Sequence, residues 1–148
     1  MAPVTVVEGV LAATALGGLA GFALAAVAWR QRQVPASRPL AALSLAGGLW
    51  ATSDIVLFAS PTVEAALVVD VVHSAIVVHV PFIWTVFVVV YTGHGEWLTR
   101  RRMALLWAPF GLFVVALTTA PWHGLSPTAV EFVTVHGWQV PDVADGPL

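Results

Sequence analysis

The chain has 148 residues, of which 59% are hydrophobic and only 9% are charged. Soluble domains carry about 25% charged residues, so this composition, with a mean hydropathy of +0.89, excludes an ordinary water-soluble globule. The net charge of −2 excludes a nucleic-acid binder that uses a broad basic surface. The absence of cysteine from the sequence excludes disulfides, zinc–thiolate sites and iron–sulfur clusters. We therefore expect a small all-α membrane protein.

Four apolar segments are long enough to cross a bilayer, which requires about 20 apolar residues in a helix. Because arginines follow the first segment rather than precede it, that segment is interpreted as a retained helix and not as a cleaved signal peptide. Residues 1–120 are predicted to form a four-helix transmembrane bundle, and residues 121–148 a polar tail. The predicted transmembrane helices cover residues 4–29, 40–60, 63–91 and 103–120.

All six basic residues are arginines, and they lie on two alternate loops. One group follows the first predicted helix and the other precedes the fourth. By the positive-inside rule both arginine loops are cytoplasmic, which places the N-terminus and the C-terminal tail outside. The prediction is a multi-pass protein of the plasma membrane. The arginines are Arg30, Arg32 and Arg38 in the first loop, and Arg100, Arg101 and Arg102 in the second.

The C-terminal tail contains one stretch with strand character. Residues 129–140 alternate in polarity around His136–Gly137, a pattern that predicts a short extracellular β-hairpin. An isolated hairpin is marginally stable in water. We therefore expect it to rest on the helix ends or on a partner that is missing from the chain.

Three ionisable residues within the predicted helices are the most informative polar positions, because such groups are costly in a membrane unless they are satisfied. Asp54 lies in the second helix, and Asp70 and His73 lie in the third. The two helices form a hairpin, so these side chains are predicted to reach a similar depth. Helical phase places Trp50 one turn from Asp54 on the same face, and Trp84 on the same stripe of the third helix as Asp70 and His73. The candidate ligand-binding residues are Trp50, Asp54, Asp70, His73 and Trp84.

Three interpretations of this cluster remain open. It can form a polar pocket that opens to the outside, or a hydrogen-bonded clamp between helices that binds no ligand. Alternatively, Asp70 lies in the hydrated headgroup region. His79 falls on the opposite face of the third helix and is expected to make a different contact. Because no other predicted helix carries a histidine, no bis-histidine haem site is expected, and we predict no cofactor, no metal site and no catalytic residues.

Gly17 and Gly21 in the first helix have the small-xxx-small spacing that permits close helix packing. A segment this rich in alanine and glycine also produces such pairs by chance. The sequence therefore leaves open whether the two glycines form a specific helix contact.

The stretch from residue 80 to residue 102, VPFIWTVFVVVYTGHGEWLTRRR, is the most distinctive part of the sequence. It resembles the N-terminal seven-transmembrane region of membrane histidine kinases, especially those of haloarchaea. That family has a proline and a tryptophan in the third helix, followed by a Tyr-Thr-Gly and Trp-Leu-Thr-Arg signature. The resemblance extends over essentially the whole chain. It implies structural roles for Pro81, Tyr91, Gly93, Trp97 and Arg100.

This resemblance implies a sensory input module that is truncated after the fourth helix and lacks helices five to seven and the output domains. Any kinase activity would then lie in domains outside this chain, so the chain itself is not expected to be an enzyme. Its expected partners are the lipid bilayer and either a second polypeptide that supplies the missing helices or further copies of itself. No nucleic-acid partner is expected.

Two alternative functions remain open at the level of sequence. One is a small four-helix transporter or proton-conducting protein that uses Asp54, Asp70 and His73. The other is a structural membrane protein that binds no ligand.

Overall fold

The structure is a computed structural model, and it describes residues 6–123, 129–135 and 138–144. All four long helices are apolar and long enough to cross a membrane, which confirms the all-α membrane fold. Their ends lie within three residues of the predicted ones. In chain order the elements are α1 (Val6–Arg30), α2 (Ser37–Phe58), α3 (Val63–Tyr91), the 3-10 turn η1 (Gly95–Trp97), α4 (Arg100–Thr118), the short α5 (Ala120–His123), β1 (Ala129–Val135) and β2 (Trp138–Ala144).

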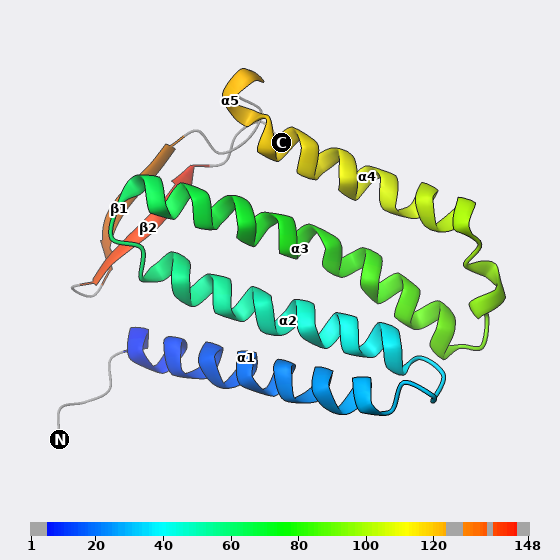
Figure 1. Ribbon diagram of the computed structural model, residues 1–148. Coiled ribbons are helices and arrows are strands. Elements are labelled where there is room, and N and C mark those ends of the chain that lie inside the picture. The colour runs from blue at the N-terminus through cyan, green and yellow to red at the C-terminus, as the bar shows by residue number, and fades with distance from the viewer. Residues whose placement is uncertain (1–5, 124–128, 136–137, 145–148) are drawn as a thin grey trace.

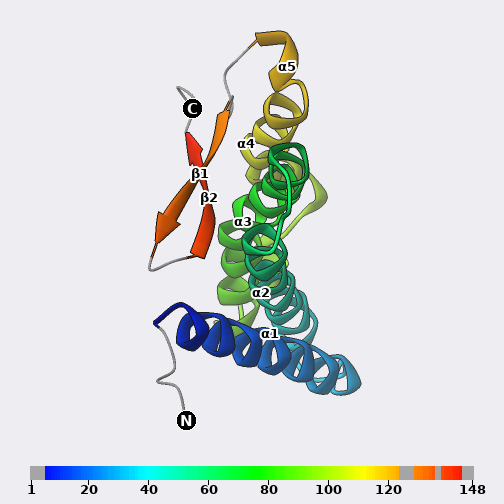
Figure 2. The same cartoon turned by 90° about the vertical axis from the view of Figure 1, so that its left-hand side faces the viewer.

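The four long helices form a single antiparallel row in chain order, with α1 and α4 at its two edges (Figures 1 and 2). Contacts run from α1 to α2, from α2 to α3, and from α3 to α4. The row is therefore open, whereas the sequence was expected to give a bundle. Antiparallel neighbours need only short connections, and such connections set the order of the helices but do not force the row to close.

The two ends of the helix row carry different residues and elements. At one end lie η1, the loops after α1 and α3, and the helix ends that carry most of the arginines, and at the other lie α5 and the hairpin (Figure 1). We call these the arginine end and the hairpin end. Alternation of the four helices across a membrane thus separates the two arginine loops from the hairpin.

Glycines set the close packing between α1 and α2. A Cβ atom built on Gly21 would lie 2.9 Å from the backbone nitrogen of Gly48 and 3.0 Å from the carbonyl oxygen of Ser44. A Cβ on Gly18 would meet the side chain of Ala51 at 3.4 Å, whereas a Cβ on Gly17 would meet nothing within 4 Å. Only Gly21 of the Gly17/Gly21 pair therefore forms the close contact with α2, because Gly17 faces open space.

The hairpin predicted in the tail is present. Strands β1 and β2 pair antiparallel, with Val135 opposite Trp138 and Ala129 opposite Ala144. The predicted turn residues, His136–Gly137, lie outside the described residues. Strand β1 contacts α3 and β2 contacts α2, and Figure 2 shows the pair lying against one face of the helix row. The hairpin thus gains from the helices the support that two strands alone lack.

Most apolar side chains on the row face outward. In the most apolar part of each long helix, no more than 17% of the residues are buried within the chain. Large side chains such as Leu16 (68% exposed) and Leu112 (70% exposed) project from α1 and α4. These surfaces require lipid or other helices around them, as expected of a membrane protein.

Candidate functional site

A polar contact between Asp54 and His73, which we call the Asp54–His73 pair, joins α2 to α3 near the hairpin end. His73 Nδ1 lies 3.2 Å from Asp54 Oδ1 and 3.1 Å from the hydroxyl oxygen of Ser53. The ring of Trp50 meets the His73 ring edge-on, with the ring centroids 6.5 Å apart. The sequence predicts that Asp54 lies within reach of Asp70 or His73, and the contact with His73 confirms it. We call Trp50, Ser53, Asp54 and His73 the polar cluster.

The hydrogen bonds define how the proton is placed in this cluster. The Ser53 hydroxyl donates to the carbonyl oxygen of Trp50 at 2.7 Å, so its oxygen is free to accept from His73. An ionised carboxylate also only accepts hydrogen bonds. When Asp54 is ionised, Nδ1 of His73 faces two acceptors and is the donor of this contact. The imidazole then retains Nε2 as an acceptor when neutral, or as a second donor when charged.

Ser53 was not among the residues predicted for the site. Its side chain is buried, and it precedes Asp54 by one residue and follows Trp50 by three. Residues three and four apart share a helix face. Trp50, Ser53 and Asp54 therefore present one continuous surface to α3. The three-residue spacing from Trp50 could have identified Ser53 as a member of the site from the sequence.

The other two predicted site residues, Asp70 and Trp84, both lie on α3. Asp70 is buried, at 7% exposure, one turn before His73 on α3. Trp84 lies eleven residues beyond His73, about 16 Å along the helix axis, and is 53% exposed. Its ring packs on Phe87, with the centroids 5.7 Å apart. Trp84 is therefore separate from the polar cluster, although helical phase alone places it on the same stripe.

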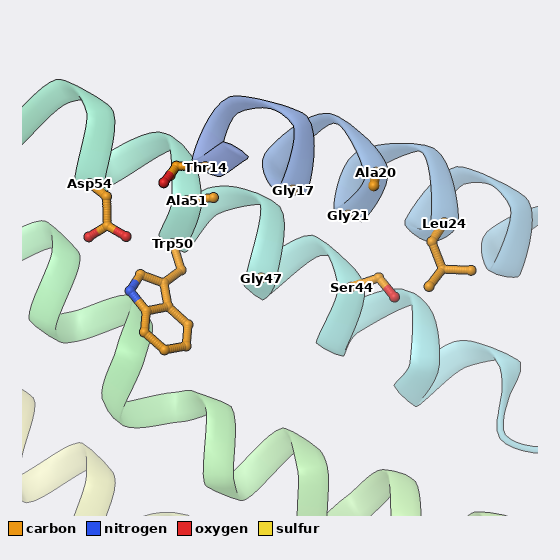
Figure 3. A pocket seen from close by; sticks show the side chains of 10 residues that line it. All are labelled: Thr14, Gly17, Ala20, Gly21, Leu24, Ser44, Gly47, Trp50, Ala51 and Asp54. Carbon is orange, nitrogen blue, oxygen red and sulfur yellow. The ribbon is translucent and has the colours of Figure 1, made fainter. Parts of the chain in front are cut away.

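A groove between α1 and α2 ends at the polar cluster (Figure 3). Its volume is about 420 Å³, within the range of small-molecule sites. Small residues form most of its wall, and Trp50 and Asp54 lie together at one end, where Trp50 extends toward α3. The Asp54 side chain is 45% exposed while it contacts His73, so this carboxylate connects the groove to α3. The lining residues are Thr14, Gly17, Ala20, Gly21, Leu24, Ser44, Gly47, Trp50, Ala51 and Asp54.

His79 makes a different contact, as expected from its position on the helix. Its Nδ1 atom donates to the carbonyl oxygen of Ala75 at 2.6 Å, and its ring lies 6.0 Å from the ring of Trp107 on α4. His73 therefore serves the α2–α3 contact and His79 the α3–α4 contact. Among the described residues, no three histidine or acidic side chains lie close enough together to hold a metal ion.

The residues of the distinctive stretch lie along α3 and in the loop before α4. Pro81 is inside α3, and Tyr91 ends that helix with its ring stacked on Phe87 at 5.5 Å. Gly93 has a φ of 82°, a left-handed conformation that favours glycine. Trp97 lies in η1, and Arg100 begins α4. The stretch thus forms the reversal of the chain at the arginine end.

Four apolar helices in an antiparallel row, with a polar contact between two of them, define a multi-pass membrane protein. Residues 13–148 match the family described as the N-terminal 7TM region of histidine kinase, and the chain belongs to that family. It is therefore a membrane sensory input module of histidine kinases. No curated protein and no solved structure matches the chain.

Proposed function

We propose that the polar cluster is the site at which this input module detects its stimulus. The observation that carries the proposal is the position of Asp54, which lines the α1–α2 groove and pairs with His73 on α3. A molecule that enters the groove and binds the carboxylate competes with His73. Occupancy of the groove would thereby change the α2–α3 contact.

The groove suits a small, largely apolar molecule with a cationic group or a hydrogen-bond donor at one end. Its walls are mainly small and apolar, and Asp54 and Trp50 supply a carboxylate and an aromatic ring at one end. A carboxylate in a site of low polarity attracts a cation or donor more strongly than it does in water. An aromatic ring adds an attractive surface for a cation.

The arrangement favours sensing over the alternative of transport or proton conduction. A conducting path needs polar groups through the depth of the membrane. In the part of the chain that the structure describes, the Asp54–His73 pair lies toward the hairpin end, and the next histidine along α3, His79, faces α4 instead. A structural role without ligand predicts the same contacts, and it is separated from sensing by the experiment below.

We further propose that this chain supplies four of the seven helices of the module, with both arginine loops in the cytoplasm and both chain ends outside. Three more helices would come from a continuation of the polypeptide or from a separate chain, and they would pack on an open edge of the row. No catalytic activity is proposed for these residues.

The experiment measures whether a change at the polar cluster reaches the arginine end. Because the chain lacks cysteine, spin labels can be attached at Gln33→Cys and His94→Cys, one in each arginine loop. In lipid nanodiscs, His73→Gln should shift the distribution of distances between the two labels. Thr85→Val is the control, since it removes a hydrogen bond within α3, from Thr85 to the carbonyl oxygen of Pro81 at 2.8 Å. An unchanged distribution in His73→Gln, in a variant that remains folded, would support a purely structural clamp.

A further inference from the structure

A cleft at the arginine end is separate from the polar cluster and has a different composition. It lies between the end of α3 and the start of α4, has a volume of about 580 Å³, and is lined by Val89, Trp97, Leu98, Arg102 and Leu106. We call it the Trp97 cleft. Four of its five lining residues are apolar or aromatic, and the fifth is a cation. This combination is typical of a site for an amphiphile with a negatively charged head.

The cleft is polar at its mouth and apolar deeper in the helix row. Arg102 and Leu106 are one turn apart on α4, so Leu106 lies about 6 Å farther from the arginine end. The Arg102 guanidinium donates from Nη1 to the carbonyl oxygen of Trp97 at 3.3 Å, which holds it beside η1. A guanidinium has five N–H donors. Within the described chain this bond occupies one, so the others can bind a phosphate, which arginine favours in a bidentate arrangement.

A second cleft at the same end repeats the arrangement between α1 and α2. It has a volume of about 240 Å³, and we call it the Trp29 cleft. Trp29 and Arg38 lie at the helix ends, and small or aliphatic side chains lie deeper along both helices. Tryptophan at the membrane interface with arginine beside it is the usual anchoring pair of a membrane protein. The lining residues are Ala25, Trp29, Arg38, Ala41, Ala42 and Leu45.

The charges around the two clefts favour an anion. Among the described residues, the loops and helix ends at the arginine end carry all six arginines, one acid, Glu96, and the imidazole of His94. Basic pockets between transmembrane helices on the cytoplasmic side recognise anionic lipid head groups. The apolar walls that continue from each arginine toward the membrane interior would accommodate an acyl chain, which a free phosphate lacks.

We infer that the Trp97 cleft binds an anionic phospholipid, with the phosphate on Arg102 and an acyl chain along Val89 and Leu106. The Trp29 cleft binds a second such lipid through Arg38. These lipids fill the spaces between neighbouring helices at the arginine end, where the row offers no protein cover. The inference does not depend on the stimulus or on the polar cluster.

Native mass spectrometry of the purified chain with phosphatidylglycerol or phosphatidylcholine tests this inference. The chain should retain phosphatidylglycerol in preference to phosphatidylcholine, and Arg102→Gln should weaken phosphatidylglycerol binding about fivefold, the equivalent of about 1 kcal/mol per basic residue. Arg101→Gln is the matched control, because Arg101 is the adjacent arginine and does not line the cleft. Equal losses in both variants would show a diffuse electrostatic attraction and overturn the inference.

A second measurement does not depend on removing an arginine. In Leu106→Cys, the single thiol lies on the deeper wall of the Trp97 cleft, and a maleimide reagent reports its accessibility. Phosphatidylglycerol in the detergent micelle should slow the labelling, whereas phosphatidylcholine or inorganic phosphate should not. Protection by inorganic phosphate alone would indicate an anion site without a lipid chain. Equal protection by both lipids would indicate no head-group recognition, and either outcome contradicts the inference.

Discussion

Asp54 Oδ1 and His73 Nδ1, 3.2 Å apart, form a polar pair that joins α2 to α3. The two side chains are 45% and 19% exposed, so the pair is accessible from one side. A deeply buried pair is costly to desolvate and difficult to disturb, whereas an accessible pair can exchange one partner for a ligand. This exposure is what makes the contact suitable for a sensor.

The first prediction concerns the strength of the contact between Asp54 and His73. A double-mutant cycle with Asp54→Asn and His73→Phe should give a coupling free energy of about 0.6–1.7 kcal/mol, between the average and the maximum measured for polar contacts between helices in a membrane protein. Unfolding of the purified chain in mixed micelles, followed by circular dichroism, supplies the four values. Thr52→Val is the control, because its hydroxyl donates within α2 to the carbonyl oxygen of Gly48. A coupling energy of zero would show that the two side chains act independently.

The second prediction separates two glycines of α1. Gly21→Ala should destabilise the chain by about 1–3 kcal/mol, because its methyl group would meet the backbone of α2 at 2.9 Å and the helices must move apart. Gly17→Ala should be neutral or stabilising by up to about 1 kcal/mol, since a Cβ there meets nothing within 4 Å and alanine favours helix. The same unfolding assay measures both. Equal destabilisation would disprove the assigned packing.

The third prediction concerns the end of α3. Gly93→Ala should cost about 1–2 kcal/mol, because the left-handed conformation at φ 82° disfavours a Cβ atom even where space is free. Gly95→Ala is the matched control two residues later, where φ is not left-handed and the nearest side-chain atom is 3.9 Å away. Both variants are compared by thermal unfolding. If Gly95→Ala were the more harmful, the conformation assigned to this turn would be wrong.

The fourth prediction concerns orientation in the membrane. Ala59→Cys lies at the hairpin end and Gln33→Cys in the first arginine loop, and both positions are exposed. In whole cells, an impermeant thiol reagent should label the cysteine at position 59 and not the one at position 33, because positive charge favours the cytoplasmic side. Labelling of both after permeabilisation is the control. The reverse pattern in intact cells would refute the orientation.

The sequence predicts the helices well because each is a long apolar segment bounded by arginine, proline or polar residues. It also places Asp54 near His73, since helices joined by a short turn bring matched depths together. The hairpin is predictable for a similar reason, because alternation and a two-residue turn signal are both local patterns.

Other features depend on packing that the sequence does not encode locally. The open row depends on which face of each helix packs against its neighbour. Because each helix is apolar on nearly all sides, its sequence does not indicate which face that is. Trp84 shares a stripe with His73 by phase, yet it lies too far along the helix to join the polar cluster. The groove is invisible in sequence because its shape depends on Gly21 forming the α1–α2 contact while Gly17 stays uncovered.

The unequal lengths of the helices have a consequence for how the protein sits in a bilayer. With 29 residues, α3 is about 43 Å long, while α4, with 19 residues, is about 28 Å long. A hydrocarbon core of about 30 Å matches α4 and leaves about 13 Å of α3, or about nine residues, beyond it. With the arginine end aligned to one interface, the opposite boundary falls close to Val71, just before His73. Hydrophobic mismatch would therefore change the surroundings of Asp54 and His73, because a thicker bilayer would draw the pair into hydrocarbon and a thinner one would expose it to water.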